Sequence, residues 1–148
     1  MQVVGFNLIK ILAKRELTYK RSAINTNIEF TNIEKESLPV LKDDEAIKIS
    51  FKFDITYGDQ EKTPDKKEKE EKQAEISFEG IIILSATKDE AKEYIKNWKK
   101  KEVPQESAIP LYNTILKRCS IKALQLEEDL NLPTHIPFPQ VRAQPKDN

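Results

Sequence analysis

The sequence is poor in the residues from which many catalytic and metal sites are built. Its 148 residues include one cysteine, one histidine and three glycines. A single cysteine excludes a disulfide within the chain, and one histidine with one cysteine cannot form a structural zinc site. The glycines are isolated from one another, so the chain has no glycine-rich phosphate loop. The sequence therefore predicts a protein without a cofactor and without a metal.

Excess charge and long apolar runs are absent as well. Lys+Arg and Asp+Glu number 25 each, so the formal net charge is zero and nothing draws the whole molecule toward nucleic acid. The longest apolar run has four residues, whereas about 20 are needed to span a bilayer. The apolar N-terminal segment is interrupted by Asn7 and Lys10 and lacks a signal-peptide cleavage site. We expect a soluble, cytoplasmic protein that binds no nucleic acid and does not insert into membranes.

The clearest pattern that is present is the alternation typical of β-strands. Glu45–Tyr57 places apolar side chains on one face and polar side chains on the other over its whole length. Val3–Tyr19 fits a helix in one half and a strand in the other, and we interpret it as a bulged strand. Asn25–Ile33 is interpreted as a short second strand, because Ile28 and Phe30 are two residues apart.

A fourth strand, Ala74–Ala86, changes character halfway along. Its first half alternates, whereas both faces are apolar from Ile81 to Leu84. A strand in a domain with one sheet buries one face on its own helices. Ile81 and Ile83, on the other face, therefore need a second cover. That cover could be more of the chain, a second copy of the chain or a bound apolar ligand.

Two helices are predicted after the strands. Thr87 and Glu90 form a capping box at the start of the first helix. The second helix, about Ala108–Leu130, carries an apolar stripe that is wider than one sheet face would bury. Two strand regions, a long hairpin and two terminal helices predict an α+β domain with an antiparallel sheet. Residues 58–73 are expected to form a charged loop and residues 140–148 a polar tail.

The residues with catalytic chemistry are interpreted as structural. His135 lies in a proline-rich turn, and Cys119 lies on the apolar stripe of the long helix as a small core residue. The acidic cluster Glu127, Glu128 and Asp129 falls at the end of that helix, where we expect solvated charge. The sequence therefore predicts that the protein is not an enzyme.

Several short motifs, taken in their order along the chain, resemble the SecB export chaperones. Each motif is short and degenerate, so the weight of the resemblance comes from the correct order over about residues 6–139. The motifs are the opening strand Ile11–Lys20, the acidic pair Asp43 and Asp44, the strand from Glu75 to Ile82, the pair Pro110 and Tyr112, Cys119, and finally Leu130–Leu132 with Pro137 and Phe138.

The resemblance implies a function as well as a fold. The implied fold is one α+β domain over residues 1–139, a four-stranded antiparallel sheet with a long C-terminal helix packed on it and a short helix before it. Proteins of this family assemble as a dimer of dimers, with their long helices between the sheets, and hold unfolded preproteins in apolar grooves without ATP. The residues that it implies for polypeptide binding are Ile28, Phe30, Leu38, Val40, Leu41, Ile81, Ile83 and Phe138. Those that it implies for the oligomer interface are Tyr112, Ile115, Leu116, Cys119, Ala123 and Leu126.

The sequence also departs from the family's pattern. The connection between the first two strands is shorter and lacks the aromatic residues of the family's cleft, and no second terminal helix follows Phe138. Of two acidic positions that contact the SecA motor in the family, Glu16 is kept and Lys20 has the opposite charge. These departures argue against a SecA-type partner while leaving general binding of unfolded polypeptides in place.

The leading hypothesis is an ATP-independent holdase for non-native polypeptides, including preproteins for export. One alternative is an oligomeric structural or adaptor protein of the same fold, whose apolar faces are all used in assembly. A second alternative is an enzyme that uses tyrosines and carboxylates on the sheet. A pocket with converging carboxylates would favour the enzyme.

Overall fold

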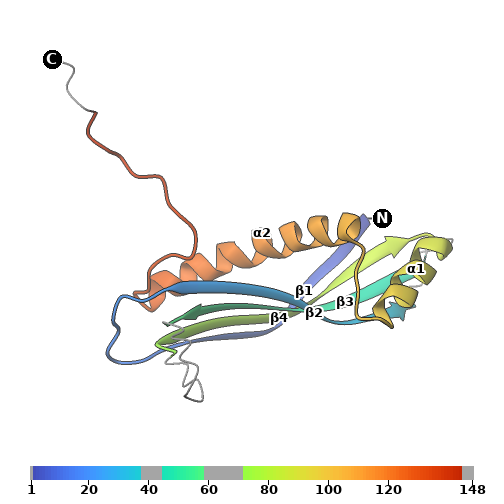
Figure 1. Ribbon diagram of the computed structural model, residues 1–148, viewed down its shortest axis with the longest axis horizontal. Helices are drawn as coiled ribbons and strands as arrows, with labels where there is room; N and C mark the ends of the chain where they lie inside the picture. The colour runs from blue at the N-terminus through green and yellow to red at the C-terminus, as the bar shows by residue number, and fades with distance from the viewer. Residues whose placement is uncertain (1, 38–44, 59–71, 145–148) are drawn as a thin grey trace, which may run out of the picture.

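The computed structural model describes residues 2–37, 45–58 and 72–144. Four strands precede two helices (Figure 1). The strands are β1 (Gln2–Arg15), β2 (Ile24–Glu36), β3 (Glu45–Tyr57) and β4 (Ala74–Ala86), and the helices are α1 (Lys88–Trp98) and α2 (Gln105–Asp129). The described ranges leave out Leu38, Val40, Leu41, Asp43 and Asp44, and most of the predicted charged loop.

The four strands form one antiparallel sheet in the order β1-β4-β3-β2. β3 and β4 pair along their whole length, from Glu45 opposite Ala86 to Tyr57 opposite Ala74. β1 and β2 are therefore the edge strands, each with one row of backbone groups left unpaired within the sheet. The predicted fold class is confirmed: an α+β architecture with a four-stranded antiparallel sheet and a long C-terminal helix.

The edge strands differ from their predicted lengths. β1 is bulged, as predicted, with register shifts between Val3 and Gly5 and between Leu8 and Lys10. It ends at Arg15, so the expected continuation to Tyr19 is wrong, and Leu17 is almost fully exposed. β2 is longer than predicted because its polar residues face solvent while their backbone still pairs with β3.

The core lies on one face of the sheet, which is called here the inner face. The apolar positions of β3 and β4 on this face are fully or almost fully buried, whereas the alternate positions keep some exposure. α2 runs along the inner face, and α1 packs near the end of the sheet where α2 begins (Figure 1). Cys119 is completely buried in α2, which confirms its interpretation as a small core residue.

The helices begin as their sequences indicate. The Thr87 hydroxyl accepts a hydrogen bond from the Glu90 backbone N–H, as the predicted capping box requires. Pro110 lies in the second turn of α2 without ending it, and the Thr114 hydroxyl donates to the Pro110 carbonyl. α2 therefore continues unbroken for 25 residues along the sheet.

The opposite, outer face of the sheet carries no helix in the described part of the chain. Ile81 and Ile83 lie on this face and are half-buried by their neighbours on β1 and β3. Which of the three possible covers lies over these two residues therefore stays a prediction.

Gly80 provides a test of this packing. A Cβ atom at Gly80 would lie 2.6 Å from the Asn7 carbonyl oxygen and 2.7 Å from Phe51 Cζ, whereas one at Gly5 would meet Ile83 Cβ at 3.4 Å. We expect Gly80→Ala to lower the free energy of unfolding by about 1–3 kcal/mol, because an edge strand or a core ring must move. Gly5→Ala should stay within about 0.5 kcal/mol of the wild type. Urea denaturation of both variants measures the difference, and equal stabilities would contradict the packing described.

Candidate functional site

The residues predicted to bind polypeptides lie on different surfaces. Ile28 and Phe30 are half-buried on the inner face at the β2 edge, where they pair with Phe53 and Phe51. Ile81 and Ile83 lie on the outer face, and Phe138 is exposed in the segment after α2. The structure therefore does not gather the predicted residues into one groove; Leu38, Val40 and Leu41 fall outside the described residues.

An apolar surface does form where α2 passes along the β2 edge. The Phe30 ring stacks on the Tyr112 ring, with centroids 4.8 Å apart and planes 11° from parallel. Ile109 and Leu116 lie three residues before and four residues after Tyr112, so the three side chains share one side of α2. Ile109 is 51% exposed and Leu116 is 38% exposed. We call the set Ile28, Phe30, Ile109, Tyr112 and Leu116 the helix–edge surface.

This surface combines two features that suit an extended polypeptide. β2 is an edge strand, so its outer row of N–H and C=O groups is not paired within the sheet. Exposed aliphatic and aromatic side chains lie beside that edge on α2. An added strand could pair its backbone with β2 and place alternate side chains against α2.

Most residues predicted for an oligomer interface are used within the chain. Ile115, Cys119 and Ala123 have no exposed surface because they pack on the sheet. Tyr112 and Leu126 are half-buried, and Leu116 retains the most surface of the set. The apolar stripe on α2 is wider than the buried face of the helix, because residues at its margins, such as Ile109, lie outside the core. Assembly through this helix therefore stays a prediction.

The outer face of the sheet is more polar. The Ser77 hydroxyl donates to Asp54 at 2.6 Å, and Lys52 and Lys48 lie within ion-pair distance of Asp54 and Glu34. Ile81 is flanked by Asn7 and Ser50, and Ile83 by Gly5 and Lys48. Two half-buried isoleucines among polar neighbours offer less apolar area than the helix–edge surface.

The β1 edge is a further exposed apolar region. Val3, Val4, Ile9 and Ile11 are each more than a third exposed. Val4 and Ile9 fall at the two register shifts, where one residue of β1 has no partner on β4. The bulges disturb the regular spacing of backbone groups that a further strand would need.

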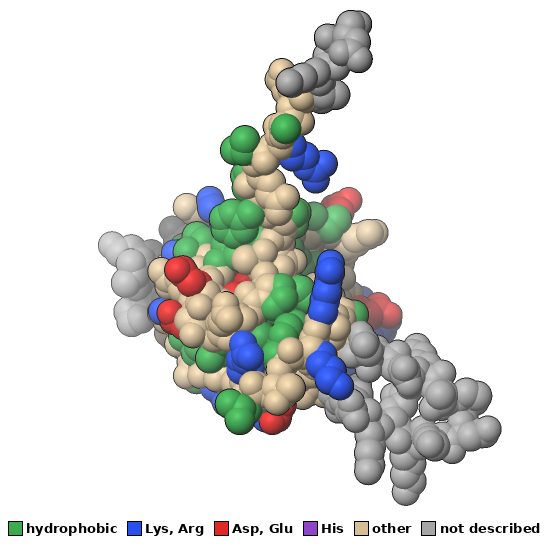
Figure 2. All heavy atoms as spheres, turned by 90° about the vertical axis from the view of Figure 1, so that its left-hand side faces the viewer, with side chains coloured by type: hydrophobic (Ala, Val, Ile, Leu, Met, Phe, Trp, Pro, Cys, Tyr) green, Lys and Arg blue, Asp and Glu red, His purple; other side chains and the backbone are tan. Residues whose placement is uncertain are grey.

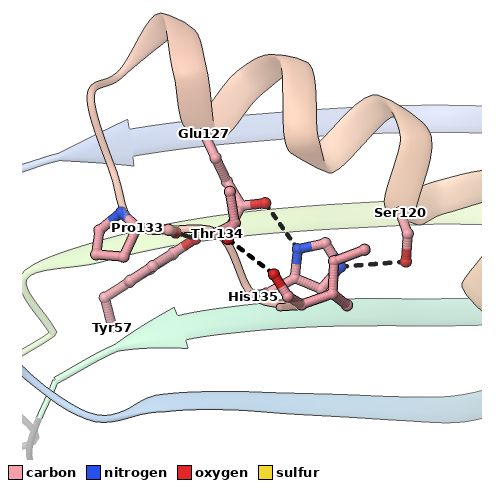
Figure 3. A network of polar contacts seen from close by, with 7 residues as sticks. Tyr57, Ser120, Glu127, Pro133, Thr134 and His135 are labelled. Atoms are coloured by element: carbon pink, nitrogen blue, oxygen red, sulfur yellow. Dashed lines mark hydrogen bonds and ion pairs between the residues drawn. The ribbon is translucent and has the colours of Figure 1, made fainter. Parts of the chain in front are cut away.

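A buried polar network joins the sheet, α2 and the segment that follows α2 (Figure 3). Tyr57 from β3 donates to Glu127 Oε2, and its hydroxyl lies 3.0 Å from the Pro133 carbonyl oxygen. His135 Nδ1 lies 2.7 Å from Glu127 Oε1, and His135 Nε2 lies 3.1 Å from Ser120 Oγ. Because a carboxylate only accepts hydrogen bonds, Nδ1 carries the proton in this arrangement.

Burial determines the chemistry of the network. The side chains of His135 and Glu127 are 2% and 0% exposed. Burial raises the pKa of the Tyr57 hydroxyl well above its ordinary value of 10.0, and the hydrogen bond and charge of Glu127 raise it further. Tyr57 therefore remains a neutral donor to the carboxylate.

The prediction that Glu127 is solvated charge is wrong, whereas Glu128 and Asp129 are exposed as expected. Glu127 is buried because it supplies the acceptor for two donors on other segments, Tyr57 on β3 and His135 after α2. The only sequence signal was its place on the side of α2 that also carries Ser120, seven residues earlier. The interpretation of His135 as structural agrees with these contacts.

Ser120, His135 and Glu127 are hydrogen-bonded in the same sequence of contacts as the nucleophile, base and carboxylate of serine hydrolases. Ser120, however, lies in the interior of α2, where backbone N–H groups donate to the preceding turn of the helix. Its own N–H is therefore not available to stabilise an oxyanion, which acyl transfer requires. The geometry fits a structural network better than a catalytic one.

A cavity of about 330 Å³ lies between α1 and the start of α2. Its lining residues are Glu90, Glu93, Tyr94, Pro104, Glu106 and Ser107. Its three glutamates come from the two helices, not from the sheet as the enzyme alternative expected. Burial, the largest effect, raises the pKa of Tyr94, so its hydroxyl stays protonated and is a poor nucleophile. Within the described ranges, no cluster of His, Cys, Asp and Glu is arranged to hold a metal ion.

The fold and these surfaces define an antiparallel α+β protein with an edge strand beside an exposed helix stripe. Neither a protein-family model nor a curated protein sequence matches the chain. Among solved structures, the chain is similar to the SecB-like chaperone of Mycobacterium tuberculosis in complex with a ChAD peptide from the HigA1 antitoxin. The two chains are 17% identical, the alignment covers 97% of this chain and 92% of the other, and the TM-score is 0.48.

None of the described helices is both long and apolar enough to cross a membrane.

Tyr57 and Tyr19 form a matched pair for testing the network. Tyr57 donates to a buried carboxylate, whereas the buried Tyr19 hydroxyl has no hydrogen-bond partner among the described residues. We expect Tyr57→Phe to lower the free energy of unfolding by about 1–3 kcal/mol, because Glu127 loses a donor that water cannot replace. Tyr19→Phe should be nearly neutral. Chemical denaturation measures both, and a Tyr57→Phe variant as stable as the wild type would contradict the network.

The reactivity of Cys119 tests the packing of α2. Burial raises the pKa of the thiol from an ordinary value of 9.0 to about 11. The thiolate fraction at pH 8 is then about 100-fold lower than for an exposed cysteine. Iodoacetamide should label the native protein far more slowly than the urea-unfolded protein, and labelling should accelerate as the pH rises toward 11. Rapid native labelling at pH 8 would show that α2 does not bury Cys119.

Proposed function

We propose that the protein is an ATP-independent holdase that binds extended, non-native polypeptides at the helix–edge surface. The observation that carries the proposal is the stacked pair of Phe30 and Tyr112 at the β2 edge, with Ile109 and Leu116 exposed beside it. Backbone pairing with β2 needs no particular client sequence, and the apolar side chains reward burial of any hydrophobic residue. Together these features favour a broad range of unfolded clients.

The finer parts of the proposal concern partners and assembly. The clients are unfolded polypeptides, among them preproteins for export, and the protein acts in the cytoplasm. Assembly as a dimer of dimers would use exposed apolar residues outside the helix–edge surface, such as those of the β1 edge. The SecB resemblance of the sequence supports this proposal, and Lys20 weighs against coupling to a SecA-type motor.

Two exposed aliphatic residues of α2 allow a matched test of the binding surface. Leu116 is 38% exposed beside the β2 edge, whereas Ile121 is 61% exposed elsewhere on the helix. We expect Leu116→Asp to weaken binding of a labelled unfolded polypeptide about tenfold, because a charge would be buried at the contact. Ile121→Asp should leave the affinity unchanged. Fluorescence anisotropy measures both, and high salt should not weaken wild-type binding, since the contacts are apolar.

The same samples separate the holdase from the adaptor alternative. Stoichiometric wild-type protein should suppress the light scattering of an aggregating unfolded client. No suppression and no client binding, combined with an oligomer that binds no dye for exposed apolar surface, would overturn the proposal and favour the adaptor. Equal effects of Leu116→Asp and Ile121→Asp on client affinity would show that binding occurs away from the helix–edge surface.

A further inference from the structure

The chain turns back along α2 after that helix ends. Asn131 adopts a left-handed conformation with φ of 53°, and the Leu132 N–H donates to the Glu127 carbonyl at 2.8 Å. Arg15 Nη1 donates to the carbonyls of Leu130 and Asn131 at 2.8 and 3.1 Å. These contacts fix the direction in which residues 131–136, called here the strap, leave the helix (Figures 1 and 3).

His135 is the last anchored residue of the strap. Its side chain is buried, while the flanking residues Thr134 and Ile136 are exposed. Every residue from 136 to 144 is exposed, and this segment extends away from the body of the molecule (Figure 1). Its apolar residues Phe138 and Val141 are 56% and 104% exposed. Figure 2 shows hydrophobic side chains around the base of this segment.

The strap lies on the continuation of the helix–edge surface. The His135 ring packs edge-on against Phe53, with centroids 6.3 Å apart, and Phe53 pairs with Ile28 on β2. The next inner pair along the sheet, Phe51 with Phe30, is where Tyr112 stacks. On α2, Ser120 holds His135 two turns beyond Tyr112. The imidazole therefore lies one inner pair along the sheet from the stacked Phe30 and Tyr112, on the same side of α2.

Few contacts seat His135, and two of them are hydrogen bonds. Glu127 and Ser120 from α2 hold its two ring nitrogens, Tyr57 from β3 orients Glu127, and the ring packs on Phe53. Among the described residues, the other polar contacts of residues 132–135 to the body are those of the Leu132 N–H with Glu127 and of the Pro133 carbonyl with Tyr57. Loss of the imidazole would therefore free the strap beyond Pro133.

We propose that the strap occupies part of the polypeptide-binding surface and that His135 is the latch that holds it there, so that release of the strap lengthens the surface open to a client. The inference rests on the proposed function and adds a regulatory element to that site. The strap is a segment without helix or strand that contacts both α2 and the sheet, and a stretch of client polypeptide could lie in its place. Because a closed strap reduces the fraction of binding-competent protein, it lowers the apparent affinity by that fraction.

The test compares the full-length wild type with His135→Ala, and with Ser120→Ala as a milder variant. The heteronuclear NMR NOE of the Thr134 and Ile136 amides reports whether the strap is released, and hydrogen exchange within β3 reports whether the body stays folded. We expect lower NOE values at Thr134 and Ile136 in His135→Ala with β3 still protected, and binding of the labelled unfolded polypeptide about threefold or more tighter. Ser120→Ala should shift both measurements in the same direction by less. Arg142→Ala, in the free segment, is the control and should change neither.

The outcomes separate the latch from the proposed function. A released strap with unchanged or weaker client binding would overturn the inference, because the strap would then not compete with clients. If the strap amides of His135→Ala stay as rigid as those of the wild type, His135 is not the latch. Absence of client binding by the wild type and all variants would overturn the proposed function and this inference with it. Tight wild-type binding with the same affinity whether or not the strap is released would overturn the inference alone.

Discussion

A four-stranded sheet is wider than one helix can cover, and this mismatch shapes the whole molecule. Three gaps of about 4.8 Å separate the four strands, so their outer axes are about 14 Å apart, whereas a helix with its side chains is about 10–12 Å across. α2 buries the middle of the inner face through Ile115, Cys119 and Ala123. The margins of the inner face, along β1 and β2, must be covered by residues other than these three.

The two margins are covered differently. Toward β1, the Arg118 guanidinium lies over the Phe6 ring at 5.2 Å, so a long polar side chain shields the aromatic residue. Toward β2, the strap covers the end of the inner face near Tyr57. Further along this margin, Phe30 and Tyr112 stack on one another. The part of the β2 margin around Phe30 and Tyr112 is thus left uncovered by both the core of α2 and the strap.

The buried network explains why a polar strap can lie against a hydrophobic core. Placing a carboxylate in the interior is costly unless donors satisfy it. Glu127 receives Tyr57 and His135, one from the sheet and one from the strap, so the network exists only when all three segments are in place. The same dependence makes the strap sensitive to the loss of a single side chain.

The sequence by itself determined the strands, the helices and the order in which they occur. The bounds of β3 follow from strict alternation, because a period of two residues has one consistent register on a sheet, and those of β4 follow from alternation that passes into a short apolar run. The end of β1 at Arg15, the buried state of Glu127 and the position of the strap were decided only by tertiary structure. Ile28 and Ile81 look equivalent in sequence, yet pairing places them on opposite faces. Glu127 looks like its neighbours Glu128 and Asp129, yet it alone faces Tyr57 and His135, and no local pattern encodes partners that lie 70 residues before it and eight residues after it.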